Sequence, residues 1–498
     1  MKTIEVFAWA VLLGSTRLAI SAQDIPLGTV TQESLVDQIY SSKNVVNLPN
    51  GQSGLVVSPD GRRLAYVSNL SGKSAVVVDG RESKIYDKIE PFSLSFSPDS
   101  KRVAYLASAD HKEFVVVDGK EGKPYYGCTN LIFSSDSRHV LYRALTGEKT
   151  LVVVDEKEGK LYAGCGRPIF SPNGERVAYD AQLGGNQMIV VDGKEGAPYP
   201  WGDLYSPDIT FSSDSKHLFY RLLKDGKNLI VIDGKETEPY PGGPGFGGLA
   251  FSPDGKRNAY MVQAGDKQLV VLDGKNGEKY DGIWGIVFSP DSQRVAYWAK
   301  SGDKWLVVVD GKEQKKYDRL SRSLLFSPDS RRLAYVAESG SESMVIVDGK
   351  EGKAFDKIYL GEDEDYPPNY HGSRAMYCAP IADDTLTFSP DSAHVAYLVG
   401  MGSEKNVRWA AVLDEKLGKA YERISSIAFS PDSKHLVYVA AMHDGANGLV
   451  KRVVIDGSEG KPYEDVFTSA SLVFDSPDGF HYLAGEKAGV SLVSCVIK

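Results

Sequence analysis

The fold is decided by the stretch S-L-L-F-S-P-D-S-R-R-L-A-Y-V-A, residues 323–337, together with S-M-V-I-V-D-G-K-E-G-K-A-F, residues 343–355. Three short apolar runs, at 324–326, 333–336 and 344–347, favour strands because they are bounded by turn residues and rich in strand-forming side chains. The Ser-Pro-Asp-Ser segment and the later Asp-Gly pair are turn signals. A weaker fourth strand is expected to begin at Ala354. One such unit cannot bury both of its apolar faces alone, so it needs neighbours of the same pattern.

The pattern occurs eleven times in the 498 residues. The copies are marked by the acidic residue of the turn, which is Asp60, Asp99, Asp136, Asp214, Asp254, Asp291, Asp329, Asp391, Asp432 and Asp478, with Asn173 as the eleventh member. Their spacing is 37 to 41 residues except for two late intervals of 62 and 46. A period near 40 with about four short strands predicts an all-β propeller, here of eleven four-stranded blades. No repeat contains an apolar stripe at helical spacing, which excludes helical solenoids.

The two ends of the chain bear on how the array closes. The last repeat has three strands before the chain stops, and Asn44–Leu48 precedes the first repeat, so this N-terminal strand is expected to complete the last blade and remove an exposed edge. Eleven blades exceed the usual four to eight. The sequence is therefore compatible with two arrangements. One is a single closed array, and the other is two rings of about five and six blades, divided at 241–245.

Residues 1–22 have the features of an export signal, with Lys2, an apolar core from Val6 to Gly14 and small residues at 20–22. Residues 23–43 are expected to be a linker and 44–498 the repeat array. No later stretch approaches the length of a membrane span. The net charge is −9 and no basic stripe is present, which argues against nucleic acid as a partner. We expect a periplasmic or secreted protein. Equivalent positions in adjacent blades usually lie too far apart for a disulfide, so Cys128 and Cys165 are not expected to pair, and the pairing of Cys378 and Cys495 is open.

The phrase F-S-P-D-[SG]-[KR]-R-[VL]-A-Y, nearly unchanged at 96–105, 251–260, 288–297 and 326–335, resembles the WD40-like (PD40) repeats of the TolB type. The resemblance covers residues 45–498. It implies a β-propeller in an exported bacterial protein. It implies no particular activity, because this fold hosts many unrelated functions.

Two ladders of side chains run through the repeats. Tyrosines recur at the second strand and aromatics at the fourth, and we interpret both as packing between blades. The residue that opens the second strand is always basic, while the third strand ends in Asp in ten repeats. These strands are antiparallel, so a cross-strand ion pair is expected. The basic positions are Arg63, Arg102, His139, Arg176, His217, Arg257, Arg294, Arg332, His394, His435 and His481.

Connection lengths indicate where a binding site lies. The turns between strands one and two and between strands three and four have constant length, whereas the opposite connections expand in repeats eight to ten, including an insertion at 359–384. Long loops on a rigid scaffold often carry function. Aromatic, arginine and histidine side chains suit an interface. The candidate binding residues are Tyr366, Tyr370, His371, Arg374, Tyr377, Arg408, Trp409 and His443.

We interpret the chain as a non-catalytic, exported propeller scaffold that binds a protein, peptide or glycan of the cell envelope through these loops. No G-x-S-x-G, H-E-x-x-H or phosphate-loop motif is present. No catalytic residue, cofactor or metal ligand is expected on this interpretation. The alternative is a metal-dependent polysaccharide lyase or hydrolase in which His371 and His443 converge. A purely structural spacer would show uniform loops, which this chain lacks.

Overall fold

The computed structural model describes residues 30–33, 38–46, 53–70, 72–204, 209–237, 240–241, 249–340, 342–355, 357–358, 385–401, 407–445, 448–467, 472–486 and 489–497. These residues form strands and turns, and their one named helical element is a single 3₁₀ turn, η1 (Pro91–Ser93). Over the described ranges, no helix has the length and apolar character that crossing a membrane requires.

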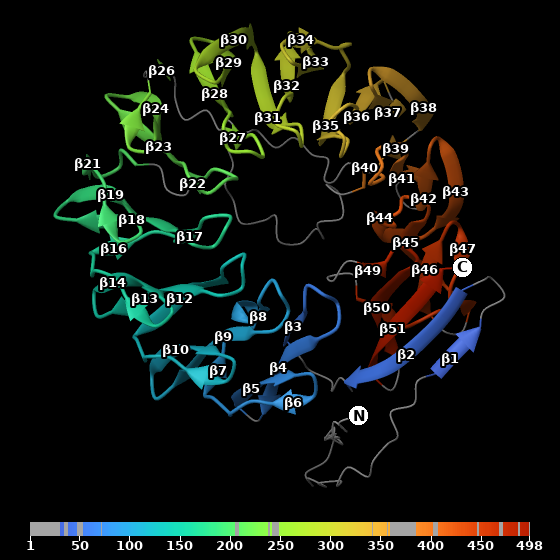
Figure 1. Ribbon diagram of the computed structural model, residues 1–498, viewed down its shortest axis with the longest axis horizontal. Coiled ribbons are helices and arrows are strands. Elements are labelled where there is room, and N and C mark those ends of the chain that lie inside the picture. The colour runs from blue at the N-terminus through green and yellow to red at the C-terminus, as the bar shows by residue number, and fades with distance from the viewer. Residues whose placement is uncertain are drawn as a thin grey trace. The chain divides into compact units, whose positions relative to one another are not determined.

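The strands form eleven antiparallel sheets in a propeller arrangement, as the repeats predicted. The chain divides into two compact units, of residues 1–201, 450–452 and 460–498, and of residues 202–449 and 453–459. The first contains blades 1–4 and the sheet of blade 11, and the second contains most of blades 5–10. The boundary between these units falls after Trp201. Figure 1 shows blades 1–4 following one another in blue to teal, and blades 5–10 in green to orange.

The first compact unit holds the following strands. Blade 1 consists of β3 (Ser53–Val57), β4 (Leu64–Leu70), β5 (Lys73–Val78) and β6 (Arg81–Glu82). Blade 2 consists of β7 (Lys88–Ile89), β8 (Ser95–Phe96), β9 (Val103–Ala109), β10 (Lys112–Val117) and β11 (Lys120–Glu121). Blade 3 consists of β12 (Gly127–Phe133), β13 (Val140–Thr146), β14 (Lys149–Val154) and β15 (Lys157–Glu158). Blade 4 consists of β16 (Gly164–Cys165), β17 (Ile169–Phe170), β18 (Val177–Leu183), β19 (Asn186–Val191), β20 (Lys194–Glu195) and β21 (Tyr199–Pro200). Blade 11 consists of β48 (Asp465–Val466), β49 (Val473–Ser476), β50 (Gly479–Glu486) and β51 (Gly489–Ile497), with β2 (Gln38–Val46) and β1 (Val30–Glu33) added.

Blades 5–10 hold the remaining strands. Blade 5 consists of β22 (Thr210–Phe211), β23 (Leu218–Lys224), β24 (Lys227–Ile232), β25 (Lys235–Glu236) and β26 (Tyr240–Pro241). Blade 6 consists of β27 (Leu249–Phe251), β28 (Asn258–Ala264), β29 (Lys267–Leu272) and β30 (Lys275–Tyr280). Blade 7 consists of β31 (Gly282–Phe288), β32 (Val295–Ser301), β33 (Lys304–Val309) and β34 (Lys312–Glu313). Blade 8 consists of β35 (Arg319–Phe326), β36 (Leu333–Ser339), β37 (Glu342–Val347) and β38 (Lys350–Phe355). Blade 9 consists of β39 (Lys357–Ile358), β40 (Thr387–Phe388), β41 (Val395–Met401), β42 (Arg408–Leu413) and β43 (Lys416–Tyr421). Blade 10 consists of β44 (Arg423–Phe429), β45 (Leu436–His443), β46 (Leu449–Ile455) and β47 (Ser458–Glu459).

Blades 1–10 run a–b–c–d in chain order, and the turn between strands c and d is an Asp-Gly pair, or Asp-Glu in blades 3 and 9. In blade 1, Val78 pairs directly with Arg81, so Asp79 and Gly80 are a two-residue loop. Both have positive φ, 51° and 80°. A two-residue hairpin with two positive φ angles is a type I′ turn, whose twist matches the strands it joins. This explains why the sequence places Asp and Gly there.

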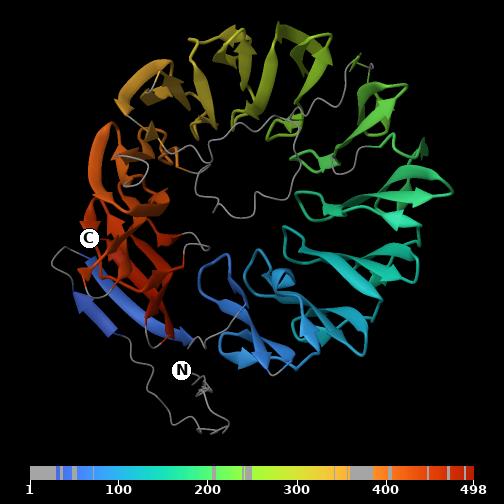
Figure 2. The same ribbon diagram turned by 180° about the vertical axis from the view of Figure 1, so that it is seen from behind.

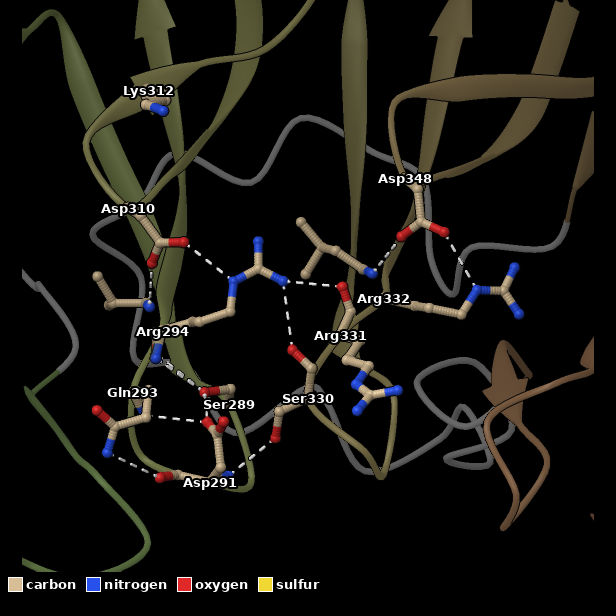
Figure 3. Close-up of polar contacts among 12 residues, drawn as sticks. Ser289, Asp291, Gln293, Arg294, Asp310, Lys312, Ser330, Arg331, Arg332 and Asp348 are labelled. Atoms are coloured by element: carbon tan, nitrogen blue, oxygen red, sulfur yellow. Dashed lines mark hydrogen bonds and ion pairs between the residues drawn. The ribbon is translucent and has the colours of Figure 1, made fainter.

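Within a blade, the Ser-Pro-Asp turn and the Asp-Gly turn are joined by one hydrogen-bond network, shown for blade 7 in Figure 3. The fully buried Ser289 hydroxyl donates to Asp291 at 2.6 Å and accepts from the backbone N–H of Arg294 at 2.9 Å. The Arg294 Nε lies 3.0 Å from Asp310 Oδ2, and the N–H of Val295 donates to Asp310 Oδ1 at 2.9 Å. This is the ion pair between strands b and c that the sequence pattern predicted.

The same arginine also reaches the next blade, which the sequence did not indicate. Arg294 Nη1 donates to the backbone carbonyls of Ser330 and Arg331, at 3.3 and 3.0 Å. Its guanidinium carbon lies 5.1 Å from the centre of the Phe326 ring. The backbone N–H of Asp291 donates to the Ser330 hydroxyl at 2.9 Å. Figure 3 shows these bonds crossing from blade 7 to blade 8. The contact is therefore a clamp between neighbouring blades as well as a bond within one.

Blade 11 departs from the ladder because its strand c lacks the terminal Asp. His481 pairs instead with Asp475 of its own first strand, Nδ1 to Oδ2 at 2.7 Å. Its Nε2 lies 2.6 Å from the carbonyl oxygen of Asp60 in blade 1. His481 is fully buried. It thus joins blade 11 to blade 1 and takes its carboxylate from its own first strand, a partner that the repeat pattern did not indicate.

The aromatic ladders pack between blades, as predicted. Tyr125, the strand-d aromatic of blade 2, meets Tyr142 of blade 3 edge to face at 6.2 Å, and both are buried. Burial raises the pKa of the Tyr142 hydroxyl to about 12. The Tyr125 hydroxyl donates to Glu158 at 2.8 Å, and Lys123 pairs with the same carboxylate at 2.6 Å. Blade 2 is thereby fixed to blade 3 along its outer strand as well.

The N-terminal strand completes the last blade, as the sequence predicted, but it is longer and begins earlier. β2 pairs antiparallel with β51, from Gln38 opposite Ile497 to Val46 opposite Val490. Both views show this blue strand beside the red strands of the C-terminus (Figures 1 and 2). β1 adds a further strand to the sheet. Both strands overlap the 23–43 span expected to be a linker, so these parts are strand.

Three cysteines, Cys128, Cys165 and Cys495, are buried free thiols. The first two do not pair, in agreement with the expectation. Cys378, like the proposed signal at 1–22, lies outside the described residues.

Candidate functional site

Each blade has two ends with different chemistry. We call the end with the Ser-Pro-Asp and Asp-Gly turns, such as 327–330 and 348–349 in blade 8, the turn end. The opposite end, with the b–c hairpin and the d–a connection, is the hairpin end. The candidate residues Arg408, Trp409 and His443 all lie near the hairpin ends of blades 9 and 10.

The hairpin end is held by a second contact between blades in several places. Asp281 follows the strand-d tyrosine of blade 6, pairs with Lys267 of its own blade at 2.5 Å and accepts the backbone N–H of Gly302 in the b–c turn of blade 7 at 2.6 Å. Asp87 makes the same contacts with Lys73 and the N–H of Asp110. The acid therefore joins the first residue of strand c to the hairpin of the next blade.

In blades 9 and 10 this contact gathers two of the predicted residues on one carboxylate. Glu422 follows the strand-d tyrosine of blade 9. Its Oε1 accepts the backbone N–H of His443 at 3.1 Å and lies 3.6 Å from Arg408 Nη1. Its Oε2 lies 2.7 Å from His443 Nδ1. The bond from the His443 backbone, followed by its side chain, holds the pKa of Glu422 below the usual range of a glutamate.

The two gathered side chains remain accessible. The Arg408 side chain is 51% exposed and that of His443 is 66% exposed, while the Glu422 side chain between them is only 27% exposed. The surface therefore presents a guanidinium and an imidazole whose positions are fixed by a half-buried carboxylate. Such a pair is suited to binding carboxylate or other hydrogen-bond-accepting groups.

Trp409 lies beside this pair but is mainly a packing residue. It opposes Gly400 on one side and Tyr421 on the other. Its ring is so close to Gly400 that a Cβ there would lie 3.0 Å from it. Trp305 of blade 7 occupies the equivalent position and packs against Trp284 with the ring centres 4.7 Å apart and the planes tilted by 45°. The half-buried Trp409 thus packs against the core cluster that blades 9 and 10 share.

The five candidates of the insertion, Tyr366, Tyr370, His371, Arg374 and Tyr377, lie outside the described residues, as does the 359–384 span. The longer b–c connections are visible at their ends. β41 stops at Met401 and β42 begins at Arg408, whereas Ala109 pairs directly with Lys112 across a two-residue turn in blade 2.

A metal centre receives no support from the part of the chain that the structure describes, where no group of three or more His, Cys, Asp or Glu side chains could hold an ion. The ladder histidines are also dispersed. His139, His217, His394 and His435 each bond the Asp that ends strand c of the same blade.

Sequence reasoning missed Glu422, although a signal for it exists. The residue after the strand-d aromatic is acidic in blades 1, 6, 7, 8, 9 and 10. In blades 1, 6, 7 and 9 its carboxylate accepts a backbone N–H at the hairpin end of the next blade. Reading that position down the repeats would have pointed to the contact that brings Arg408 and His443 together.

No family model matches the chain, and no curated protein matches it. Solved structures with similarity include the propeller domain of the trilobed protease from Pyrococcus furiosus, at 16% identity over 54% of this chain and 96% of that one, with a TM-score of 0.28. The Dos1 propeller is 13% identical over 67% of this chain and 92% of that one, with a TM-score of 0.31. A protein described as TolB from Agrobacterium tumefaciens is 17% identical over 40% of this chain and 83% of that one, with a TM-score of 0.23. We take no role from likenesses of this size.

Proposed function

We propose that the protein is an exported, non-catalytic scaffold that binds a protein or peptide of the cell envelope at the hairpin ends of blades 8–10. Export rests on residues 1–22, and the periplasm or the cell exterior is the proposed location. The binding surface comprises Arg408, His443 and the 359–384 insertion. Glycan is the other ligand class that such a surface could accept.

The observation that carries the proposal is the cluster of Arg408 and His443 on Glu422. The equivalent acids in blades 1 and 6 bond only a lysine and a turn N–H. Blade 9 replaces the lysine with a guanidinium, and blade 10 adds an imidazole on a longer hairpin. Arginine and aromatic-like planar side chains are favoured as anchors of interfaces. Arg408 and His443 therefore lie together on one exposed surface at the hairpin ends of blades 9 and 10.

The test compares capture of partners from the native envelope fraction by the mature protein and by variants. Deletion of 362–383 should abolish capture of the partner that the wild-type protein retains, and Arg408→Ala with His443→Ala should weaken it at least tenfold. Arg331→Ala, which removes an exposed arginine at the turn end of blade 8, is the matched control and should retain capture. The melting transitions of all variants should agree closely. Undiminished capture by the deletion variant would refute the proposed site.

A further inference from the structure

A pocket of about 490 Å³ lies between blades 2 and 3, at their hairpin ends. Its apolar lining includes Phe92, Leu106 and Leu131, and its charged lining consists of Lys88, Glu90 and Glu113. Both blades belong to the first compact unit. The pocket is thus formed by neighbouring blades and is separate from the surface of blades 9 and 10.

Glu113 is unusual for its place in the repeat. It is the residue of strand c that lies opposite the strand-d aromatic, here Tyr125. The other nine blades that have this pair carry Ser74, Thr150, Gln187, Asn228, Gln268, Trp305, Ser343, Trp409 and Lys451 there. Blade 2 alone places an acid at this position.

The Glu113 carboxylate has no cationic partner among the described residues. Its Oε2 accepts the backbone N–H of Cys128 at 2.8 Å. The nearby lysines are engaged elsewhere, because Lys112 lies over the Tyr126 ring at 3.1 Å and Lys88 pairs with Glu90 at 3.1 Å. The side chain is half-buried, so the charge is partly removed from water without a compensating cation. The pocket therefore favours a positively charged guest.

Phe92 supplies a flat apolar wall for such a guest. It lies on η1 and is 93% exposed, the most exposed large apolar side chain among the described residues. The turn beneath it is fixed, because the Ser93 hydroxyl donates to the Glu90 carbonyl at 2.6 Å and accepts the N–H of Leu106 at 2.8 Å. An exposed ring on a fixed turn, lining the same pocket as a carboxylate, is suited to stacking with a guanidinium.

Apolar surface continues from the pocket along blade 3. A Cβ at Gly127 would lie 3.7 Å from Leu145 and 3.8 Å from Glu113 Oε2, so Leu145 and the carboxylate flank the same backbone. Tyr126 is 63% exposed and Leu145 37% exposed. In blades 1 and 6 the position of Tyr126 is an aspartate that closes the interface with an ion pair. The exposed apolar surface beside the pocket, which includes Tyr126 and Leu145, is therefore larger than one bound arginine side chain would cover.

From this geometry we propose that the pocket between blades 2 and 3 binds an arginine side chain of a peptide or protein partner. The guanidinium meets Glu113 and stacks on Phe92, the aliphatic stem lies on Leu106 and Leu131, and an apolar neighbour in the peptide covers Leu145. Arginine fits better than lysine because its planar head can both stack and donate to a carboxylate. This inference goes beyond the proposed function, since it concerns other blades and another ligand.

The test uses the full mature chain and two probe peptides, acetyl-Leu-Arg-Leu-amide and its citrulline twin, which has the same shape without the charge. Affinities are measured by calorimetry for the wild type and for Glu113→Gln. Gln268 shows that a glutamine at this position keeps the structural bond, because its Oε1 accepts the N–H of Ile283 at 2.7 Å. The variant therefore removes charge and retains the fold.

We expect the arginine peptide to bind at least tenfold more tightly than the citrulline peptide to the wild type. Glu113→Gln should abolish that difference, and Phe92→Ala should reduce arginine affinity about two- to fivefold. Glu148→Gln is the matched control, because this exposed acid in the b–c turn of blade 3 loses the same charge outside the pocket. It should change affinity less than twofold.

Three results would overturn the proposal. Equal affinity of the two peptides for the wild type would show that charge is not recognised. Absence of saturable binding at millimolar peptide would show that the pocket takes no arginine side chain. Binding of free agmatine without binding of either peptide would replace the peptide partner with a small amine. The first comparison needs no variant, so it stands even if a substitution disturbs folding.

Discussion

The turn end and the hairpin end of the blades are built on opposite principles. At the turn end, one network of serine, aspartate and arginine or histidine recurs almost unchanged from blade to blade. At the hairpin end, the contact between blades changes with position. It is an aspartate with lysine in blade 6, a glutamate with arginine and histidine in blade 9, and a stacked Tyr126 in blade 2.

This difference between the two ends shows at which end the residues of the contact between blades can change. Because the turn-end arginines of blades 1, 2, 6, 7 and 8 bond backbone carbonyls of the next blade, the hairpin ends of these blades can lose their ion pair without opening the interface. Binding residues can therefore accumulate at the hairpin end at little cost to stability. Both proposed sites lie there, and the following predictions separate the two ends by their effects on stability.

The largest effect is expected for Arg294→Ala at the turn end. This change removes bonds to Asp310, to the carbonyls of Ser330 and Arg331, and the stack on Phe326. The free energy of local opening between blades 7 and 8 should fall by about 2–3 kcal/mol, since bonds to charged groups contribute most when partly buried. Hydrogen exchange of residues 289–295 and 326–332 measures it.

The adjacent Arg331→Ala provides the control for Arg294→Ala. The Arg331 side chain is 86% exposed and lies 3.9 Å from Asp329, so its loss should alter opening by less than about 0.5 kcal/mol. If the two variants exchanged at the same rate, the interblade clamp would contribute nothing and the contrast between the ends would fail.

A smaller effect is expected for Ser430→Ala in blade 10. Ser430 is fully buried, donates to Asp432 at 2.7 Å and accepts the N–H of His435 at 2.9 Å. The bond that Ser430 donates is the main cause that lowers the pKa of Asp432 to about 2. Loss of the hydroxyl should destabilise the protein by about 1–2 kcal/mol at neutral pH.

The pH dependence of this effect has a definite sign. A lowered carboxylate pKa contributes stability that is present above the unfolded pKa near 3.8 and is lost as pH falls toward about 2. The gap between wild type and Ser430→Ala should therefore narrow between about pH 4 and pH 2. Urea unfolding at several pH values tests this, and a gap that widened in acid would show that the hydrogen bond does not govern Asp432.

The smallest change in stability is expected for Tyr126→Asp, which introduces at blade 2 the acid that blades 1 and 6 carry. The new carboxylate would replace the stacking of Lys112 on the ring with an exposed ion pair. Such pairs contribute little, so stability should change by less than about 0.5 kcal/mol. Binding of the arginine peptide should nevertheless weaken, because apolar surface beside the pocket is lost. A large loss of stability measured by urea unfolding would mean that the hairpin end is structural here.

The sequence predicted the architecture well because every blade repeats the same local signals. The Asp-Gly and Ser-Pro-Asp turns, the tyrosine ladders and the pairing of strands b and c follow from spacing within one repeat. Contacts between blades were harder to predict than contacts within one blade. The repeat shows which positions recur, but it does not show which atoms of the next copy those residues contact. Arg294 therefore appeared as a partner of Asp310 alone, and its bonds to Ser330 and Arg331 were missed.

The candidate site was predicted only in part, and for a related reason. Loop length pointed to blades 9 and 10, and Arg408 and His443 do meet there on Glu422. The pocket at Glu113 gave no length signal, since blade 2 has ordinary connections. Its signal was the residue type: blade 2 has an acid at a position where the other blades have a neutral or basic residue. This became visible only when the strand register identified the equivalent residues.

The central claim is that the hairpin end binds a partner whereas the turn end joins the blades. Photocrosslinking tests this claim most directly. A benzoylphenylalanine is placed at Arg408, at the hairpin end, or at Arg331, at the turn end, both of which are exposed. Each protein is irradiated in the native envelope fraction. The account predicts a discrete adduct from position 408 and none from position 331. Adducts from position 331 with none from position 408 would contradict it.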